Sequence, residues 1–188
     1  MFLLFVTVSG QVQNIDSLIH VLETERLSPV EQLSLYEKIT LFYVTHDLGK
    51  GTEYAREGIQ LAEKEKDKKK ESAFYRFLGA IHYYQSKFDT SRIYLDKALS
   101  LAVEINDKPF QVMTYSELGN LYYLQNNYSS ALEYYMKGLT LNDGKPNRST
   151  AAILVNMANI HRTLNHPDRR SISVNRHWKS PNSLRLMI

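Results

Sequence analysis

Histidine is the side chain that most often binds metals or exchanges protons near neutral pH. The sequence has six of them: His20, His46, His82, His161, His166 and His177. They form neither a His-x-x-x-His pair nor a His-Glu-x-x-His motif, and there is no cysteine to complete a ligand set. Glycine-rich phosphate-binding motifs and the Gly-x-Ser-x-Gly nucleophile motif are also missing from the sequence. We therefore expect a protein that is not an enzyme, with no catalytic residues, no metal site and no cofactor.

Tyrosine is the residue type that stands out instead. The 188 residues include 13 Tyr against 7 Phe and 1 Trp, and the tyrosines recur at related places along the chain. Tyr and Arg are the residues most often found as hot spots of protein binding, and Asn can hydrogen-bond an extended peptide backbone. The composition therefore favours recognition of a protein or peptide over chemistry.

The positive charge of the chain is concentrated at its end. The net charge is +3, but the five basic residues between positions 169 and 188 have no acidic residue among them, which leaves 18 basic and 20 acidic groups before that point. Nucleic-acid binding needs a basic surface, so we do not expect nucleic acid as the ligand of the main part of the chain. The run Lys66–Glu71 mixes both signs and is interpreted as a solvated turn between two helices.

The elements that position these residues are helices. A chain of this length with 43% hydrophobic residues can form an ordinary domain and its core. Apolar residues return every three or four positions, and the breaks between the periodic segments are rich in Gly and Asn. An N-terminal helix is expected within residues 11–29. Ser28, Pro29 and Glu31 form a capping box with proline at the first helical position, which predicts the start of the next helix. The expected fold class is all-α.

The chain also repeats itself. Residues 78–88 match residues 118–128 at an offset of 40, with Leu-Gly at the start of both segments, and residues 157–161 continue the pattern at an offset of 39. A weaker earlier copy ends in Ala55, Ile59 and Ala62. This pattern resembles the tetratricopeptide repeat, a helix-turn-helix unit with small residues where its helices cross. The resemblance covers about residues 30–168.

The resemblance implies a right-handed superhelical solenoid of antiparallel helix pairs, with about three to four repeats. The expected repeats are 36–71, 72–111, 112–150 and an incomplete 151–168. A small residue is needed where paired helices approach closely, which suits Gly79, Gly119 and Ala158 on the first helices, and Ala131 and Gly138 on the second. His82 and His161 occupy the position that Tyr122 fills in the middle repeat, so both are expected to pack between helices.

In this family the first helix of each pair lines a concave binding face. Carrying those positions across gives eight candidate groove residues: Arg76, Tyr83, Tyr84, Met113, Asn120, Tyr123, Asn159 and Arg162. Asn120 and Asn159 match the asparagines of the family's carboxylate clamp. The basic clamp partners are replaced by Ser116, Glu117, Val155 and Asn156, so binding of a chaperone tail is not expected. The alternative is that the groove tyrosines only cover the surface of a stacked array.

The N-terminus resembles part of a secretory signal. Residues 2–8 are almost entirely apolar and are followed by Ser9 and Gly10, as in the core and cleavage region of a signal peptide, but the first basic residue is Arg26. We interpret residues 1–10 as a truncated signal-peptide-like segment, the alternative being a strand or helix packed in the fold. The expected location is periplasmic or otherwise extracytoplasmic, with cytoplasmic as the alternative. No stretch of the sequence is long and apolar enough for a transmembrane segment.

The C-terminal residues 169–188 depart from the repeat. Arg170 and His177 stand where the pattern requires Ala, and Pro181 falls where a helix should be regular. One choice of codons, read one base earlier, converts residues 177–188 into Ala-Leu-Glu-Ile-Ala-Lys-Gln-Leu-Thr-Val-Asn-Asp, which is a plausible second helix. We interpret the tail as frame-shifted and the chain as a fragment, and sequencing the gene would decide. The alternative is a genuine capping segment.

A missing last helix would leave the final repeat uncapped and open to self-association. Two functional classes follow from these features. The repeats resemble the sensor regions of bacterial two-component and other signalling proteins, which implies the partner-sensing part of a larger exported signalling protein. The alternative is a free-standing adaptor or assembly scaffold without an output domain.

Overall fold

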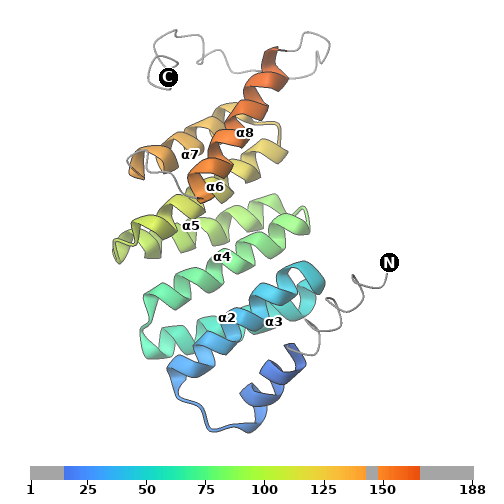
Figure 1. The fold of residues 1–188 in the computed structure, drawn as a ribbon, viewed down its shortest axis with the longest axis vertical. Helices are drawn as coiled ribbons and strands as arrows, with labels where there is room; N and C mark the ends of the chain where they lie inside the picture. Colours follow the sequence, from blue (N-terminus) through green and yellow to red (C-terminus); the bar gives the residue numbers. More distant parts are fainter. Residues whose placement is uncertain (1–14, 143–147, 166–188) are drawn as a thin grey trace. The chain divides into compact units, whose positions relative to one another are not determined.

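The computed structural model describes residues 15–142 and 148–165, all of them in helices or in the turns between helices (Figure 1). Residues 15–24 are helical within the expected N-terminal helix. The helices that follow are α2 (Pro29–His46), α3 (Leu48–Glu65), α4 (Lys68–Tyr84), α5 (Phe88–Glu104), α6 (Lys108–Leu124), α7 (Tyr128–Leu141) and α8 (Arg148–Asn165). The described part contains no strand, which confirms the all-α prediction. The predicted signal-like segment 1–10, the tail 169–188, His166 and His177 lie outside the described residues.

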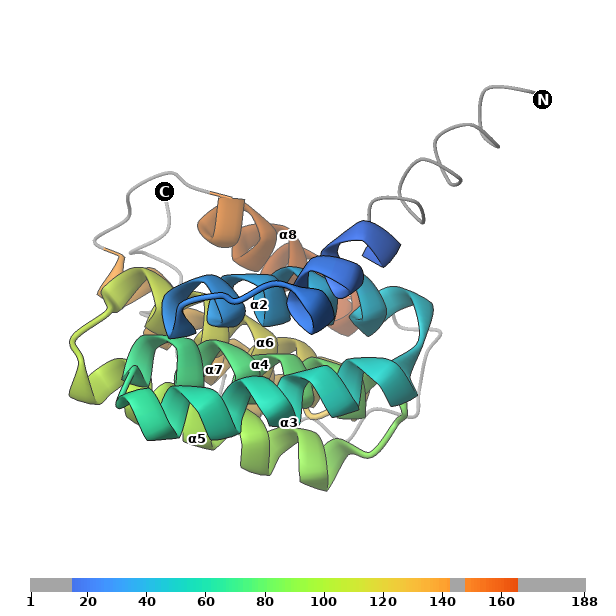
Figure 2. The same ribbon diagram turned by 90° about the horizontal axis from the view of Figure 1, so that it is seen from below.

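The chain divides into two compact units, residues 1–107 and 108–188. In the first unit α2 pairs with α3 and α4 pairs with α5, and α3 also packs against α4. Its core includes Leu33, Phe74 and Leu78, while Ile15 of the N-terminal helix packs with Ile39 and Tyr43 of α2. Figure 2 shows this helix lying beside α2.

In the second unit α6 pairs with α7, and α8 contacts both of them. The core of this unit is formed by Val112, Leu132, Tyr135, Ile153 and Ile160, all of them buried. Among the described residues, the first unit therefore contains the antiparallel pairs α2–α3 and α4–α5, and the second contains the pair α6–α7 followed by α8.

The helix starts follow the repeat in the sequence. The first helices of the pairs begin at Pro29, Lys68, Lys108 and Arg148, so their starts are evenly spaced along the chain to within a single position. At the first of these starts the predicted capping box is present: the Ser28 hydroxyl accepts from the Glu31 backbone N–H, and the Glu31 carboxylate accepts from the Ser28 N–H at 2.8 Å. The first pair thus begins at Pro29, ahead of the expected repeat start at 36.

Four of the turns between helices share one geometry. Lys66, Ser86, Asn106 and Asn126 have φ between 54° and 58°, and they follow one another at equal intervals. After each of them, the next backbone N–H donates to a carbonyl five residues back, as from Asp67 to Ala62 and from Asn127 to Tyr122, both at 2.9 Å. This is the Schellman arrangement that ends a helix with one left-handed residue.

Glycines lie where paired helices cross, as predicted. A Cβ added to Gly79 would lie 2.7 Å from the Leu95 side chain of α5, and a Cβ added to Gly119 would lie 2.3 Å from the Tyr135 ring of α7. Ser91 strengthens the first crossing because its hydroxyl donates to the Gly79 carbonyl at 2.8 Å. Ala131 and Gly138 are also buried, as expected for the second helix.

Aromatic rings stack at matching places in the α4–α5 and α6–α7 pairs. His82 stacks on Tyr94 with ring centroids 5.3 Å apart, and Tyr122 stacks on Tyr134 at the same distance. This confirms that His82 packs between helices in the position that Tyr122 fills. Burial lowers the pKa of His82, and the positive charges of Lys87 and Arg56 act in the same direction. His82 is therefore a neutral packing residue at neutral pH.

Candidate functional site

Three of the eight predicted groove residues lie on α4 in the first unit. Arg76 is half-buried, and its guanidinium carbon lies 5.1 Å from the centre of the Phe77 ring. Tyr83 and Tyr84 make an edge contact with centroids 5.5 Å apart. Burial raises the pKa of Tyr83, whereas Tyr84 is 58% exposed. Tyr84 thus offers a solvent-facing ring braced by a more buried neighbour.

The other five lie in the second unit, where Asn120 of α6 is held by two hydrogen bonds. Its side-chain oxygen accepts from the Tyr135 hydroxyl at 2.6 Å and from Nδ2 of Asn156 at 2.8 Å. Tyr135 is fully buried, and its ring also covers Gly119. The plane of the Asn120 amide is therefore fixed by a buried tyrosine and by α8. Within the described part of the chain Nδ2 of Asn120 makes no hydrogen bond, so this donor remains available.

The remaining groove candidates lie on the same two helices, α6 and α8. Met113 and Tyr123 are half-buried on α6, and the Tyr123 ring lies 5.6 Å from that of Tyr128. On α8 the side-chain oxygen of Asn159 accepts from Nη2 of the exposed Arg162 at 3.1 Å. The structure thus joins Asn159 to Arg162, while the side chain that holds Asn120 from α8 is Asn156.

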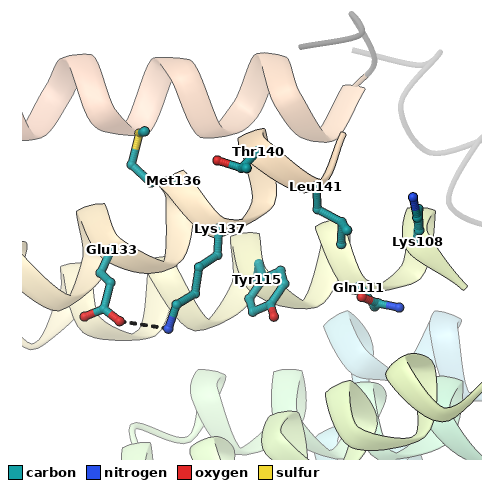
Figure 3. A pocket seen from close by; sticks show the side chains of 8 residues that line it. All are labelled: Lys108, Gln111, Tyr115, Glu133, Met136, Lys137, Thr140 and Leu141. Carbon is teal, nitrogen blue, oxygen red and sulfur yellow. Dashed lines mark ion pairs between the residues drawn. The ribbon is translucent and has the colours of Figure 1, made fainter. Parts of the chain in front are cut away.

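Sequence reasoning missed two features of the second unit. It treated Asn156 only as the replacement of a basic clamp residue, although it orients Asn120 from the neighbouring helix. It also missed an open pocket of about 650 Å³ between α6 and α7. The pocket is lined by Lys108, Gln111, Tyr115, Glu133, Met136, Lys137, Thr140 and Leu141 (Figure 3).

The pocket combines apolar and charged groups but none of the eight predicted groove residues. Lys137 donates to the Glu133 carboxylate at 2.8 Å and lies 4.9 Å from the centre of the Tyr134 ring. The hydrogen bond to Glu133 raises the pKa of Lys137. The i,i+4 spacing of Glu133 and Lys137 is the sequence signal that could have indicated this pair. The charge of Lys137 is therefore balanced by Glu133 within the pocket lining.

Among residues 15–142 and 148–165, no three His, Asp or Glu side chains come together to hold a metal ion. In the same part of the chain no helix has the length and apolar character needed to cross a membrane.

The described helices form a repeating architecture, and part of the sequence matches a known repeat family. Residues 70–143 match the sequence model described as tetratricopeptide repeat. A search of curated proteins finds no match. The fold is similar to the crystal structure of BtubC (BKLC) from P. vanneervenii, with a TM-score of 0.65 and 15% sequence identity.

That structural match covers 79% of this chain and 63% of BtubC, so the chain spans less than two thirds of the length of BtubC. At this identity the similarity concerns the fold alone. Residues 70–143 therefore match the tetratricopeptide repeat in sequence, and together with the similar fold this match supports a tetratricopeptide repeat protein. Repeats of this family generally mediate protein–protein interaction and typically serve as scaffolds without catalysis.

Proposed function

We propose that the chain is a scaffold that binds an extended peptide segment of a partner protein along the first helices of its repeats. The observation that carries this proposal is the fixed amide of Asn120. Both hydrogen bonds to its oxygen come from within the fold, so the orientation of Nδ2 is set before any ligand arrives. A donor fixed in advance loses little conformational entropy when it binds a peptide carbonyl.

The surroundings of Asn120 suit a peptide better than a small polar ligand. Met113 and Tyr123 supply apolar and aromatic contact on the same helix, and Arg162 supplies a cation on α8. Such mixtures of aromatic, Met and Arg groups are typical of protein interfaces. In the first unit Tyr84 is an exposed aromatic anchor of the same type. We infer that the preferred segment has a large apolar side chain and an acidic group.

A substitution that keeps the fold but removes the donor tests this function. Asn120→Asp retains an oxygen that can accept from Tyr135 and Asn156, but it replaces the NH₂ group by a second acceptor. Asn120→Ala, in contrast, would remove the oxygen that accepts from the buried Tyr135 hydroxyl and from Asn156, and would destabilise the protein. Gln60→Ala, which removes an exposed amide from α3, is a matched control.

The measurement is selection of peptides from a random displayed library on the full chain, followed by titration of a selected peptide. We expect Asn120→Asp to weaken binding about tenfold or more with little change in the melting temperature, and Gln60→Ala to change neither. Replacing both Tyr83 and Tyr123 by Ala should abolish capture. Undiminished binding by Asn120→Asp would show that the first-helix face is not the site.

We further propose that this binding serves a sensing role in a larger exported signalling protein. The sequence supports this role through the apolar run at residues 2–8 and the length of the repeats, and the alternative is an adaptor without an output domain. Expression of the full gene with a reporter enzyme fused to its product, followed by cell fractionation, tests export. Reporter activity confined to the cytoplasm would contradict the sensing role while leaving peptide binding intact.

A further inference from the structure

Helix α8 is apolar on two sides, but neighbours cover only one of them in the described part of the chain. Ile153, Met157 and Ile160 are buried against α6 and α7. Ala151, Leu154 and Ala158, which we call the α8 stripe, follow the i, i+3, i+7 spacing of a helix face and are all exposed, with Leu154 at 52%. In Figure 1 α8 lies alongside α6 and α7 with no described helix beyond it.

The equivalent stripes of the two preceding first helices show what should lie there. In α4 the stripe is Ser72, Tyr75 and Gly79, and in α6 it is Val112, Tyr115 and Gly119. Both are covered by the second helix of their pair, α5 over α4 and α7 over α6. A large side chain of that helix sits over the glycine, and a tyrosine of the same helix contacts the tyrosine of the stripe. The α8 stripe has the small residue Ala158 and the large residue Leu154 in the same order.

Charge indicates the direction and the chemistry of a helix that would cover the α8 stripe. α8 contains no acidic residue, and Arg148 in its first turn is exposed. In α4 the first-turn lysines Lys68 and Lys69 form ion pairs with Glu104 and Asp107, which lie at the C-terminal end of the covering helix α5 and just beyond it. An antiparallel helix over the α8 stripe would place its own C-terminal end beside Arg148 in the same way.

We propose that the α8 stripe is the docking site for an antiparallel amphipathic helix of a partner protein. This helix carries a large apolar side chain over Ala158 and an acidic residue at its C-terminal end beside Arg148. Charge argues against two other occupants. In an antiparallel pair of α8 helices from two copies, Arg148 of one would meet Arg162 of the other. The second is the chain's own tail. Residues 166–188 include five basic groups and a single acid, Asp168, so they offer little negative charge to Arg148.

The probe is a labelled peptide with the sequence of α5, residues 88–104, because that helix already has the required chemistry. Binding to the full chain is followed by fluorescence anisotropy. Leu154→Glu should weaken binding more than about tenfold, because it places a charge where a leucine would be buried. Ile93→Glu changes an equally exposed apolar residue on α5 and should leave binding unchanged. A peptide carrying Glu104→Lys should bind more weakly than the original, and this difference should shrink at high salt.

Melting temperature and molecular mass of the free chain complete the test. If the stripe faces solvent, Leu154→Glu leaves both unchanged. A lowered melting temperature with unchanged mass would show that the chain's own tail covers the stripe, and a reduced mass would show that a second copy does; either result overturns the proposal. Peptide binding that Leu154→Glu does not affect also overturns it, since the peptide then binds elsewhere. Asn120→Asp should not affect this peptide, so the outcome is independent of the proposed groove.

Discussion

Helices α4 and α8 occupy equivalent places in their repeats but have different neighbours. α4 is packed against α3 and α5 and also contacts α2, whereas the packing of α8 within its own unit is against α6 and α7. Gly79 of α4 is buried, while Ala158, its counterpart in α8, is exposed. The small residues of a repeat are therefore interface residues, and they affect stability only when the covering helix is present.

The largest expected effect is at the crossing of α6 with α7, where a small residue is covered by the second helix. Gly119→Leu should lower the stability by about 3 kcal/mol, because even the first added carbon would lie 2.3 Å from the fully buried Tyr135 ring. The melting temperature should fall by roughly 6–12 °C. Ala158→Leu makes a similar change on the exposed α8 face and should leave the melting temperature nearly unchanged. Equal losses for both variants would show that α8 is covered as α6 is.

A smaller effect concerns a buried hydroxyl on the face of α4 that corresponds to the α8 stripe. The Ser72 hydroxyl is buried and donates to the Ala98 carbonyl of α5 at 2.8 Å. Ser72→Ala should therefore cost about 1 kcal/mol in the free energy of unfolding measured with urea. Its counterpart in α8 is Ala151, which is exposed, so Ala151→Ser should be neutral. A neutral Ser72→Ala would mean that this hydrogen bond adds nothing to the pairing of α4 with α5.

The smallest effect depends on pH and on the aromatic contact of α4. The pKa of His82 is lowered in the folded state by burial and by the charges of Lys87 and Arg56. As the pH falls below the ordinary histidine pKa of about 6.5, the unfolded chain takes up a proton before the folded one does, so stability is lost. The loss ends once the pH is below the lowered pKa of the folded state.

His82→Tyr introduces the residue found at the equivalent Tyr122 and removes this titration. The melting temperature of the natural chain should fall more between pH 7.5 and 5.5 than that of His82→Tyr. Carboxylates titrate in both proteins, so the difference between the two falls is the quantity that reports on His82. Parallel pH profiles would indicate that the imidazole is protonated as easily in the folded state as in the unfolded chain.

The repeat pattern allowed much of this fold to be predicted. The repeat offset aligns Gly79 with Gly119 and His82 with Tyr122, and in both cases the structure gives the aligned residues the same type of contact. The α2–α3 pair was harder to recognise. Counted from the start of its helix, Thr40 of α2 occupies the position of Gly79 in α4 and Gly119 in α6. The glycines in close contact nearby are Gly51 of α3, against Tyr43 of α2 and Ile81 of α4, and Gly58 of α3, against Phe74 of α4.

The positions of the candidate site residues could be predicted from the sequence, but their hydrogen bonds could not. The family pattern selects Asn120, yet its orientation depends on Tyr135, whose ring lies across Gly119 and whose hydroxyl reaches the asparagine. The equivalent residue of the preceding pair is Leu95, which has no hydroxyl, so the repeat itself does not reveal the hydrogen bond. Likewise the exposure of Ala158 depends on whether a helix lies over it, and this cannot be predicted from the residue type alone.

The left-handed turn residues Lys66, Ser86, Asn106 and Asn126 recur once per helix, whereas the side-chain pattern recurs once per helix pair. Lys66 and Asn106 close second helices, whereas Ser86 and Asn126 close first helices, yet all four turns have the same geometry and are evenly spaced along the chain. A duplicated helix pair entering at any of these turns would therefore meet the same junction at both of its ends. The array can gain or lose a helix pair during evolution without a new kind of connection, and only the side chains at the two new interfaces have to adapt.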